Sequence, residues 1–231
     1  FYDDGQELAK FAAQLAEKEL PQIEASAEYS LQRRANIILY NNFADMKQSN
    51  IGLETNNITT GGTTQLVNNK LMVYFDGNHA NLKRQLRQGI ADVITKNVLF
   101  GDDLGEVAGN QTLLDLPKWL TDGYVAYLGE NWSTELDDEL KSEILSSNYN
   151  RFSSLAYDHP LLAGHAFWFF IEEKYKKENV TYFLYLARTY KNLNKASIQI
   201  TKKKFNDLLK EFMEYNDDKY YYNNDILLND V

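Results

Sequence analysis

The stretch from Asn81 to Gly101, NLKRQLRQGIADVITKNVLFG, decides how the rest of the chain is interpreted. Its apolar residues recur at intervals of three and four, which is the spacing of one face of an α-helix. They are Leu82, Leu86, Ile90, Val93, Ile94 and Leu99. The spacing predicts an amphipathic helix over residues 81–101, with its apolar face buried against a sheet.

A second block, LPKWLTDGYVAYLG at residues 116–129, follows a loop that we predict over residues 101–115. Pro117 stands at its start, and proline is favoured at the first position of a helix. The apolar face behind it consists of Trp119, Leu120, Tyr124, Tyr127 and Leu128. This block therefore predicts a second amphipathic helix.

The two blocks together resemble the gluzincin metallopeptidases, and within them the peptidase-MA-like domains that Bacteroidetes often place ahead of a β-propeller. In that family the first helix reads approximately L-R-H-E-L-x-H, and a later segment reads L-P-x-W-x-x-E-G-x-A-E-Y. The residues that match these patterns are Leu86, Arg87, Leu116, Pro117, Trp119, Gly123 and Tyr127, and Leu99, Phe100 and Gly101 match the L-F/Y-G that often follows the family's first helix. The resemblance implies an α+β, zincin-like fold that is mainly helical, with a small mixed sheet near the N-terminus.

Zinc chemistry in that family depends on four side chains. Two His at i and i+4 share a helix face, the Glu beside the first His is the general base, and a later Glu completes the site. The alignment places Gln88, Gly89, Asp92 and Asp122 at these four places, which we call the motif positions. Because glycine has no side chain to accept a proton, Gly89 cannot be the base. The resemblance thus implies a non-catalytic, degenerate domain with no zinc and no other cofactor.

A rebuilt metal site is the alternative. The chain has no Cys and only three His, at positions 79, 159 and 165, and none is spaced i, i+4 from another. That argues against zinc, which prefers imidazole and thiolate ligands. The oxygens of Gln88, Asp92 and Asp122 suit Mg²⁺, Ca²⁺ or Mn²⁺ better, which keeps an active metal-dependent peptidase or hydrolase open. A structural spacer that binds nothing is a third alternative.

Three residues are candidates for a vestigial cleft in which a peptide or protein would bind. Tyr74 lies in a strand predicted over residues 70–75, and the corresponding gluzincin strand can pair with an extended peptide. Tyr157 falls near the place of a transition-state donor in related peptidases. His165 is compatible with a ligand or a proton donor, but its aromatic helix, predicted over residues 161–176, favours a structural role.

Charge and hydropathy exclude other partners. The 231 residues carry a net charge of −9, with a pI near 4.9. This acidity argues against nucleic acid and anionic membranes. No run of 18 apolar residues occurs, so we predict no membrane span. A periplasmic, outer-membrane-associated or secreted location is implied by the resemblance alone.

The length is that of one domain, which we predict over residues 1–215. Residues 216–231 are polar and Tyr-rich and read as a tail or linker, which the resemblance would connect to a C-terminal β-propeller. Because Phe1 is not an initiator Met, we also expect a segment to be missing before it.

The other segments predict further helices and short strands. Pro21 is expected to end or kink a helix over residues 4–20. A compact apolar run predicts a strand over residues 35–40, and a short strand is also expected over residues 63–67, within a segment rich in Asn, Thr and Gly. Further helices are predicted over residues 132–147, 180–190 and 202–215, with a loop over residues 151–160 and a link over residues 194–201.

Overall fold

The computed structural model describes residues 5–48, 70–101, 116–146 and 148–229, with side chains described as far as Tyr221. The chain divides into two compact units. Unit 1 comprises Phe1–Val107 and Leu128–Glu130, and unit 2 comprises Ala108–Tyr127 and Asn131–Val231. The single domain expected over residues 1–215 stays a prediction. The predicted strand over residues 63–67 and most of the predicted loop over 101–115 lie outside the described residues.

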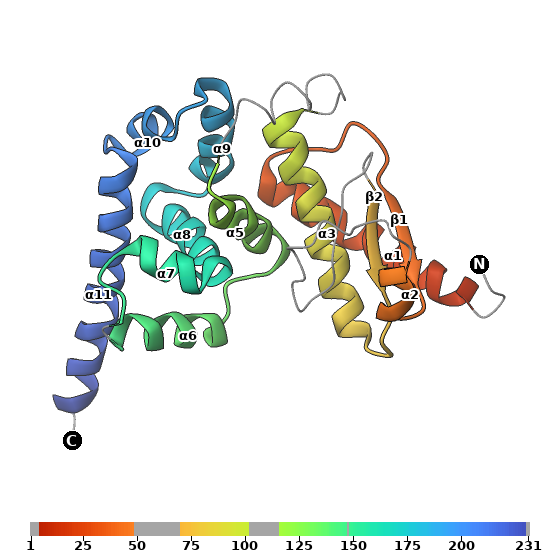
Figure 1. Cartoon of the computed structure of the whole chain (residues 1–231), viewed down its shortest axis with the longest axis horizontal. Coiled ribbons are helices and arrows are strands. Elements are labelled where there is room, and N and C mark those ends of the chain that lie inside the picture. The colour runs from red at the N-terminus through yellow and green to blue at the C-terminus, as the bar shows by residue number, and fades with distance from the viewer. Residues whose placement is uncertain (1–4, 49–69, 102–115, 147, 230–231) are drawn as a thin grey trace. The chain divides into compact units, whose positions relative to one another are not determined.

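Unit 1 is built from helices and one small sheet. Its elements are α1 (Gly5–Ala27), β1 (Asn36–Tyr40), α2 (Phe43–Gln48), β2 (Lys70–Tyr74) and α3 (His79–Phe100). In Figure 1, α3 lies beside α1 and β2, and it contacts both. The described part of the chain is therefore mainly helical with a small sheet near the N-terminus, which confirms the α+β class.

The sheet is parallel. Strands β1 and β2 pair in register from Asn36 opposite Lys70 to Tyr40 opposite Tyr74. The expectation of a mixed sheet is therefore wrong for the two strands that the structure describes. Parallel neighbours need a crossover of a dozen or more residues, and the segment from Asn41 to Asn69, which includes α2, supplies that length.

Helix α1 continues past Pro21 to Ala27, so the predicted end at this proline is wrong. A proline inside a helix costs about 3 kcal/mol, because it removes one backbone hydrogen bond and crowds the preceding turn. Ile23 and Ala27, beyond the proline, are fully buried. Burial of these side chains offsets the local cost and extends the helix.

Helix α3 confirms the prediction made from its apolar spacing. The side chain of Asn78 caps its start by accepting hydrogen bonds from the backbone N–H groups of Ala80 and Asn81. Gly101 ends it at φ 87°, a left-handed conformation that favours glycine. The predicted apolar face is buried: Leu82, Leu86, Ile90, Val93, Ile94 and Leu99.

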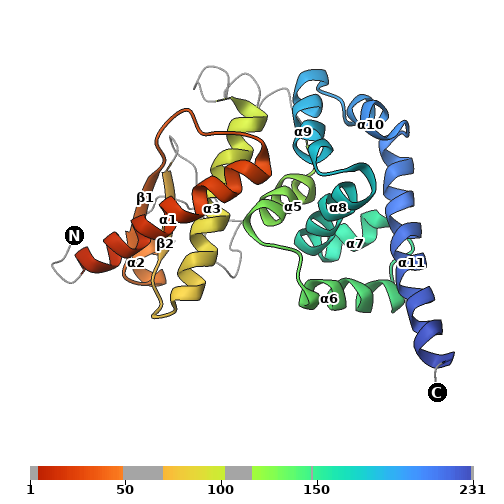
Figure 2. The ribbon, with the colours of Figure 1, turned by 180° about the vertical axis from the view of Figure 1, so that it is seen from behind.

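Unit 2 is helical over its described residues. Its elements are α5 (Lys118–Gly129, with the last two residues in unit 1), α6 (Thr134–Leu145), α7 (Phe152–Asp158), α8 (Pro160–Tyr175), α9 (Glu178–Tyr190), α10 (Leu193–Thr201) and α11 (Phe205–Asn229). Helix α8 supplies the centre of its core, where Phe167, Trp168 and Phe170 are fully buried. Figure 2 shows α11 running along the edge of the unit beside α6, α7 and α10.

Three segments of unit 2 differ from their predictions. The predicted loop over residues 151–160 contains α7, which buries Phe152 and Leu155. The predicted link over residues 194–201 is helix α10, which Asn192 caps by accepting from the Lys195 N–H. The predicted domain boundary at residue 215 falls inside α11, where Tyr220 is buried and donates to Asp137 on α6. Tertiary burial stabilises all three helices beyond their local sequence preference.

Helices α5 and α8 cross at two glycines. A Cβ placed on Gly123 would lie 2.3 Å from the Cα of Gly164, and a Cβ placed on Gly164 would lie 2.1 Å from the Trp119 carbonyl oxygen. Any larger residue would therefore push the two backbones apart. The indole N–H of Trp168 fixes the same crossing by donating to the Leu120 carbonyl at 2.8 Å.

Lys176 ends α8 in a conformation that suits glycine. Its φ of 77° and ψ of 150° resemble those of Gly101 at the end of α3, with φ 87° and ψ 175°. A residue with a Cβ in this region stores about 1–3 kcal/mol of strain. We expect Lys176→Gly to raise the free energy of unfolding by about 1 kcal/mol, after the greater chain entropy of glycine is subtracted.

The matched control for this change is Lys177→Gly, because the neighbouring Lys177 has ordinary helical angles. Glycine at this position relieves no strain and is expected to lower the unfolding free energy. Urea denaturation of both variants checks the pair. A loss of stability in Lys176→Gly equal to that in Lys177→Gly would contradict the assignment of strain.

Candidate functional site

Three of the four motif positions lie on α3 in unit 1. Gln88 is half-buried and packs against Gly129, where an added Cβ would lie 3.2 Å from the Gln88 Cα. Gly89 is buried. Asp92 accepts an ion-paired hydrogen bond at 2.8 Å from Lys96, one turn further along the same helix. The carboxylate of Asp92 therefore already has a cationic partner.

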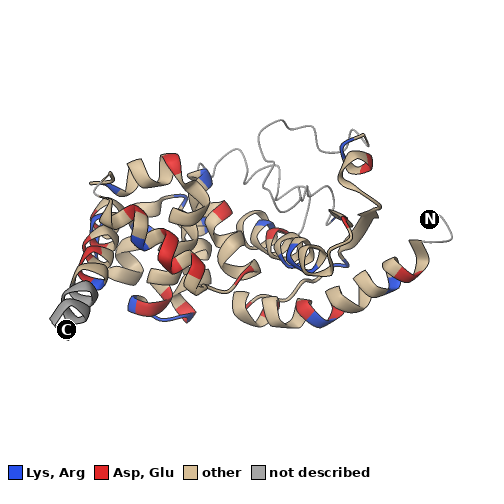
Figure 3. Ribbon diagram, turned by 90° about the horizontal axis from the view of Figure 1, so that it is seen from below, with Lys and Arg blue, Asp and Glu red and all other residues tan. Residues whose placement is uncertain are grey.

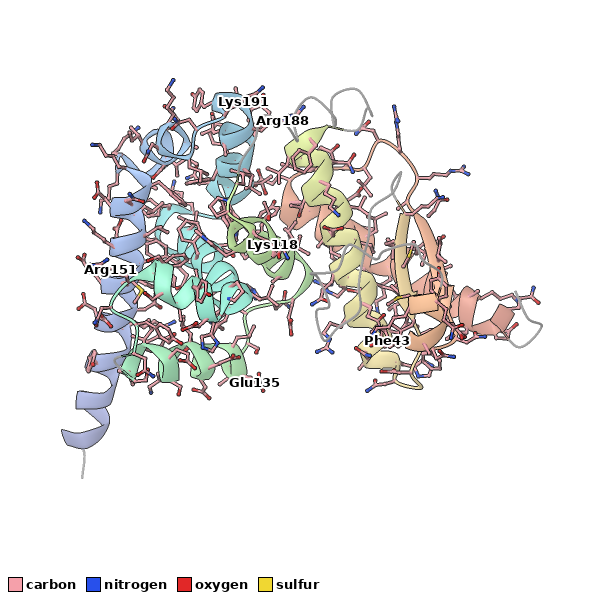
Figure 4. All side chains as sticks on the ribbon, viewed as in Figure 1. Phe43, Lys118, Glu135, Arg151, Arg188 and Lys191 are labelled. Atoms are coloured by element: carbon pink, nitrogen blue, oxygen red, sulfur yellow. The ribbon has the colours of Figure 1, made fainter. Side chains whose placement is uncertain are left out.

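Asp122, the fourth motif position, lies on α5 in unit 2. Its carboxylate pairs with Lys118, one turn earlier on the same helix, at 3.7 Å. Figure 4 labels Lys118 on α5. Both carboxylates among the motif positions are thus engaged with a lysine of their own helix.

No group of three or more His, Cys, Asp or Glu side chains lies close enough to hold a metal ion within the described ranges. The observation covers residues 5–48, 70–101, 116–146 and 148–221 only. What the motif positions can do chemically follows from their side chains. Gln88 offers a neutral amide, Gly89 offers no side chain, and each of the two carboxylates already accepts from or faces a lysine.

Arg87 on α3 makes contacts that its sequence context does not predict. Its guanidinium pairs with Glu19 on α1, and its Nε donates to the Gly129 carbonyl at 2.7 Å. Lys83 also pairs with Glu19, at 3.0 Å, and Glu19 is only 1% exposed. Burial acts to raise the pKa of Glu19, but Arg87 and Lys83 outweigh it and lower that pKa. Arg87 therefore ties α1, α3 and the end of α5 together within unit 1.

A signal for this contact exists in the sequence of α1. Its buried residues are Ala12, Ala16, Glu19, Ile23 and Ala27, which follow each other at intervals of three and four. A glutamate within such an apolar stripe must find a cation, because an unpaired buried charge is costly. The sequence does not reveal that the cation is Arg87, since that pairing is set by how α1 packs on α3.

Tyr74 ends β2, and its main chain is already bonded. Phe75 donates to the Tyr40 carbonyl, so in this parallel ladder the N–H and C=O of Tyr74 point away from β1. The side-chain amide of Gln85 on α3 binds both groups, each at 3.0 Å. Gln85 is 1% exposed. A peptide strand added beside Tyr74 would have to displace this buried amide.

The other two cleft candidates lie in unit 2 in different environments. Tyr157, on α7, is 86% exposed. His165, on α8, is 3% exposed, with its ring 5.1 Å from that of Trp132 and 6.4 Å from that of Tyr127. The burial and edge-on aromatic packing of His165 fit the structural role that its sequence context favours.

A second polar cluster lies at α8 and α11 and was not predicted. Glu211, which is buried on α11, accepts from Lys174 at 2.7 Å, from Lys203 at 2.9 Å and from the Tyr175 hydroxyl at 2.6 Å. Burial acts to raise the pKa of Glu211, but these hydrogen bonds outweigh it and lower the pKa from 4.5 to about 2. The ionised carboxylate thus joins α8, α11 and the segment between α10 and α11.

This low pKa predicts a loss of stability in acid. A carboxyl group whose pKa is lower in the folded state contributes stability above its unfolded pKa and loses it as the pH falls toward its folded pKa. For Glu211 this window runs from 4.5 down to about 2. We expect Glu211→Gln to lower the urea midpoint of unfolding at pH 7. The difference in urea midpoint between the variant and the wild type should become smaller as the pH falls through that window.

Glu214→Gln is the control for the acid prediction, because Glu214 is exposed on the same helix. The urea midpoint of Glu214→Gln should equal that of the wild type at every pH. If the urea midpoints of Glu211→Gln and of the wild type differed by the same amount at pH 7 and at pH 3, the charge of Glu211 would not be the source of the stability.

Comparison of the chain with protein-family models, with curated proteins and with solved structures gave no match. The gluzincin resemblance therefore rests on the two sequence blocks that carry it and stays a prediction. No described helix combines the length and apolar character needed to cross a membrane.

Proposed function

We propose that this chain is a non-catalytic, degenerate metallopeptidase-like domain of zincin-like fold that serves as a binding or scaffolding module. The observation that carries the proposal is the pairing of both motif carboxylates with lysines of their own helices. Asp92 binds Lys96 at 2.8 Å, and Asp122 pairs with Lys118 at 3.7 Å. A divalent cation at either carboxylate would have to compete with an ammonium group that is already in place.

The loss of the base supports the same proposal. Hydrolysis by a metal-bound water needs a side chain that accepts its proton, and Gly89 stands where the family has glutamate.

The residues that match the family pattern have packing roles that need no zinc. Gly123 lies at the close crossing of α5 and α8, and Arg87 binds both the buried Glu19 and the Gly129 carbonyl. Such contacts stabilise the fold whether or not a metal binds. They give a physical reason for a chain to retain the pattern of a metallopeptidase after losing its chemistry.

The partner that we propose is a peptide or a protein, contacted through side chains. The main chain of Tyr74 is held by Gln85, which argues against strand addition at that point of β2. The proposed setting is a larger secreted, periplasmic or outer-membrane-associated protein, with a β-propeller following this domain. That setting is supported only by the family resemblance.

The test is hydrolysis of casein and of a mixed peptide library, with and without a metal chelator. The proposal predicts no cleavage that the chelator abolishes. Chelator-sensitive cleavage would overturn it and support the active hydrolase instead. In that case Asp92→Asn and Asp122→Asn should abolish the cleavage, while Asp207→Asn, an exposed change on α11, should leave it intact.

A further inference from the structure

A pocket of about 320 Å³ opens in unit 2, and its wall carries both signs of charge. It is lined by Lys174, Lys203, Glu211, Glu214, Tyr215, Asp218 and Lys219. Figure 3 shows acidic and basic segments interleaved along α11, which supplies most of this wall. The volume is near the lower limit of ligand pockets, so the pocket suits a small ligand.

Glu211 holds two lysine side chains, Lys174 and Lys203, at one end of the pocket, which we call its positive pole. Lys174 binds one oxygen of this carboxylate and Lys203 binds the other, at 2.7 Å and 2.9 Å. The Lys174 ammonium is further fixed 5.5 Å from the centre of the Tyr215 ring. Each ammonium has three N–H donors, so both retain donors for an incoming anion. Two lysines against one carboxylate leave a net positive charge at this end.

The negative pole lies further along α11. Glu214 and Asp218 are exposed and four residues apart, so they share one face of the helix. No ion pair or hydrogen bond engages either carboxylate among the side chains described up to Tyr221.

A ligand that carries a charge of only one sign would be attracted at one pole and repelled at the other. An anion bound at Lys174 and Lys203 would face Glu214 and Asp218, and a cation bound at the two carboxylates would face the lysines. A zwitterion avoids both penalties. Glu214 and Asp218 lie three and seven positions beyond Glu211, so the negative pole extends to about 10 Å from Glu211 along the α-helix. About three extended residues span the same length.

We propose that this pocket binds a short peptide with free termini, of about three residues. Its carboxylate would accept from Lys174 and Lys203, and its ammonium group would donate to Glu214 and Asp218. This inference uses no motif position and does not rest on the proposed function. A failure of either proposal therefore leaves the other standing.

The experiment is titration of the full chain, followed by NMR, with four probes. They are trialanine, N-acetyl-trialanine, trialanine amide and inorganic phosphate. We expect trialanine to bind, and either blocked peptide to bind about tenfold more weakly, since each block removes the charge of one terminus. Binding of phosphate with no binding of trialanine would show an anion site and overturn the proposal. Equal binding of all three peptides would also overturn the proposal, and so would the absence of binding by every one of them.

Two variants of the full chain locate the binding. Glu214→Gln should weaken the binding of trialanine about tenfold. It should leave the binding of N-acetyl-trialanine unchanged, because that probe lacks the ammonium group. Glu214 is exposed, so the variant should retain its fold. Asp207→Asn, an exposed change on α11 outside the pocket, should leave trialanine binding unchanged. Equal effects of the two variants would contradict the assignment of the negative pole.

Discussion

Gly164→Ala is expected to destabilise unit 2 by about 3 kcal/mol or more. The added Cβ would lie 2.1 Å from the Trp119 carbonyl oxygen and 2.8 Å from the Cα of Gly123, and neither backbone atom can rotate away. Helices α5 and α8 must separate, and the aromatic core that they share loses contact. Overpacking of this kind costs about 1–3 kcal/mol, and more when backbone atoms collide. The urea midpoint and the melting temperature both measure the loss.

Two other glycines provide graded controls. Gly5→Ala, at the start of α1, meets no atom within 4 Å and should be neutral or slightly stabilising. Gly129→Ala would place its Cβ 3.2 Å from the Cα of Gln88, so its cost should be intermediate. A Gly164→Ala variant as stable as Gly5→Ala would show that the crossing is looser than described.

Arg87→Met is expected to lower the free energy of unfolding by about 2–3 kcal/mol, because it leaves a buried carboxylate with one cationic partner fewer. Glu19 is 1% exposed and would retain Lys83 alone. The Gly129 carbonyl would also lose its hydrogen bond from the Arg87 Nε. Chemical denaturation followed by circular dichroism measures the change.

The double variant Glu19→Gln with Arg87→Met separates loss of the charge pair from loss of packing. Because the glutamine carries no charge to compensate, the double variant should be more stable than Arg87→Met alone, by up to about 3 kcal/mol. Arg84→Met is the control on the same helix, since Arg84 is exposed and binds only Asn81 among the contacts described for it. If Arg84→Met were as destabilising as Arg87→Met, the pairing with Glu19 would not be the cause.

The sequence predicts helix α3 well because its signals are local. The apolar stripe that includes Leu82, Leu86 and Ile90 sets its buried face, and Gly101 follows its last residue. The lysine partners of the motif carboxylates can also be read from the sequence. Lys96 and Lys118 lie four residues from Asp92 and Asp122, and residues four apart are neighbours on a helix surface.

Contacts between distant segments explain what the sequence does not reveal. Gln85 is one polar residue among several on α3, and only the position of β2 makes its amide a partner for Tyr74. Glu211 meets lysines from two other segments, Lys174 and Lys203, for the same reason. Short helices such as α7 and α10 are stable through packing, which a local pattern does not report.

The metal content of the purified native chain shows whether the motif positions have lost metal binding. The protein is dialysed in turn against zinc, manganese and calcium, and each ion is then counted per chain by elemental mass spectrometry. Because Gln88 offers only a neutral amide and Asp92 and Asp122 already face lysines, we expect well under one ion per chain in every case. One tightly held ion per chain, lost in Asp92→Asn or Asp122→Asn, would contradict it and establish a rebuilt metal site.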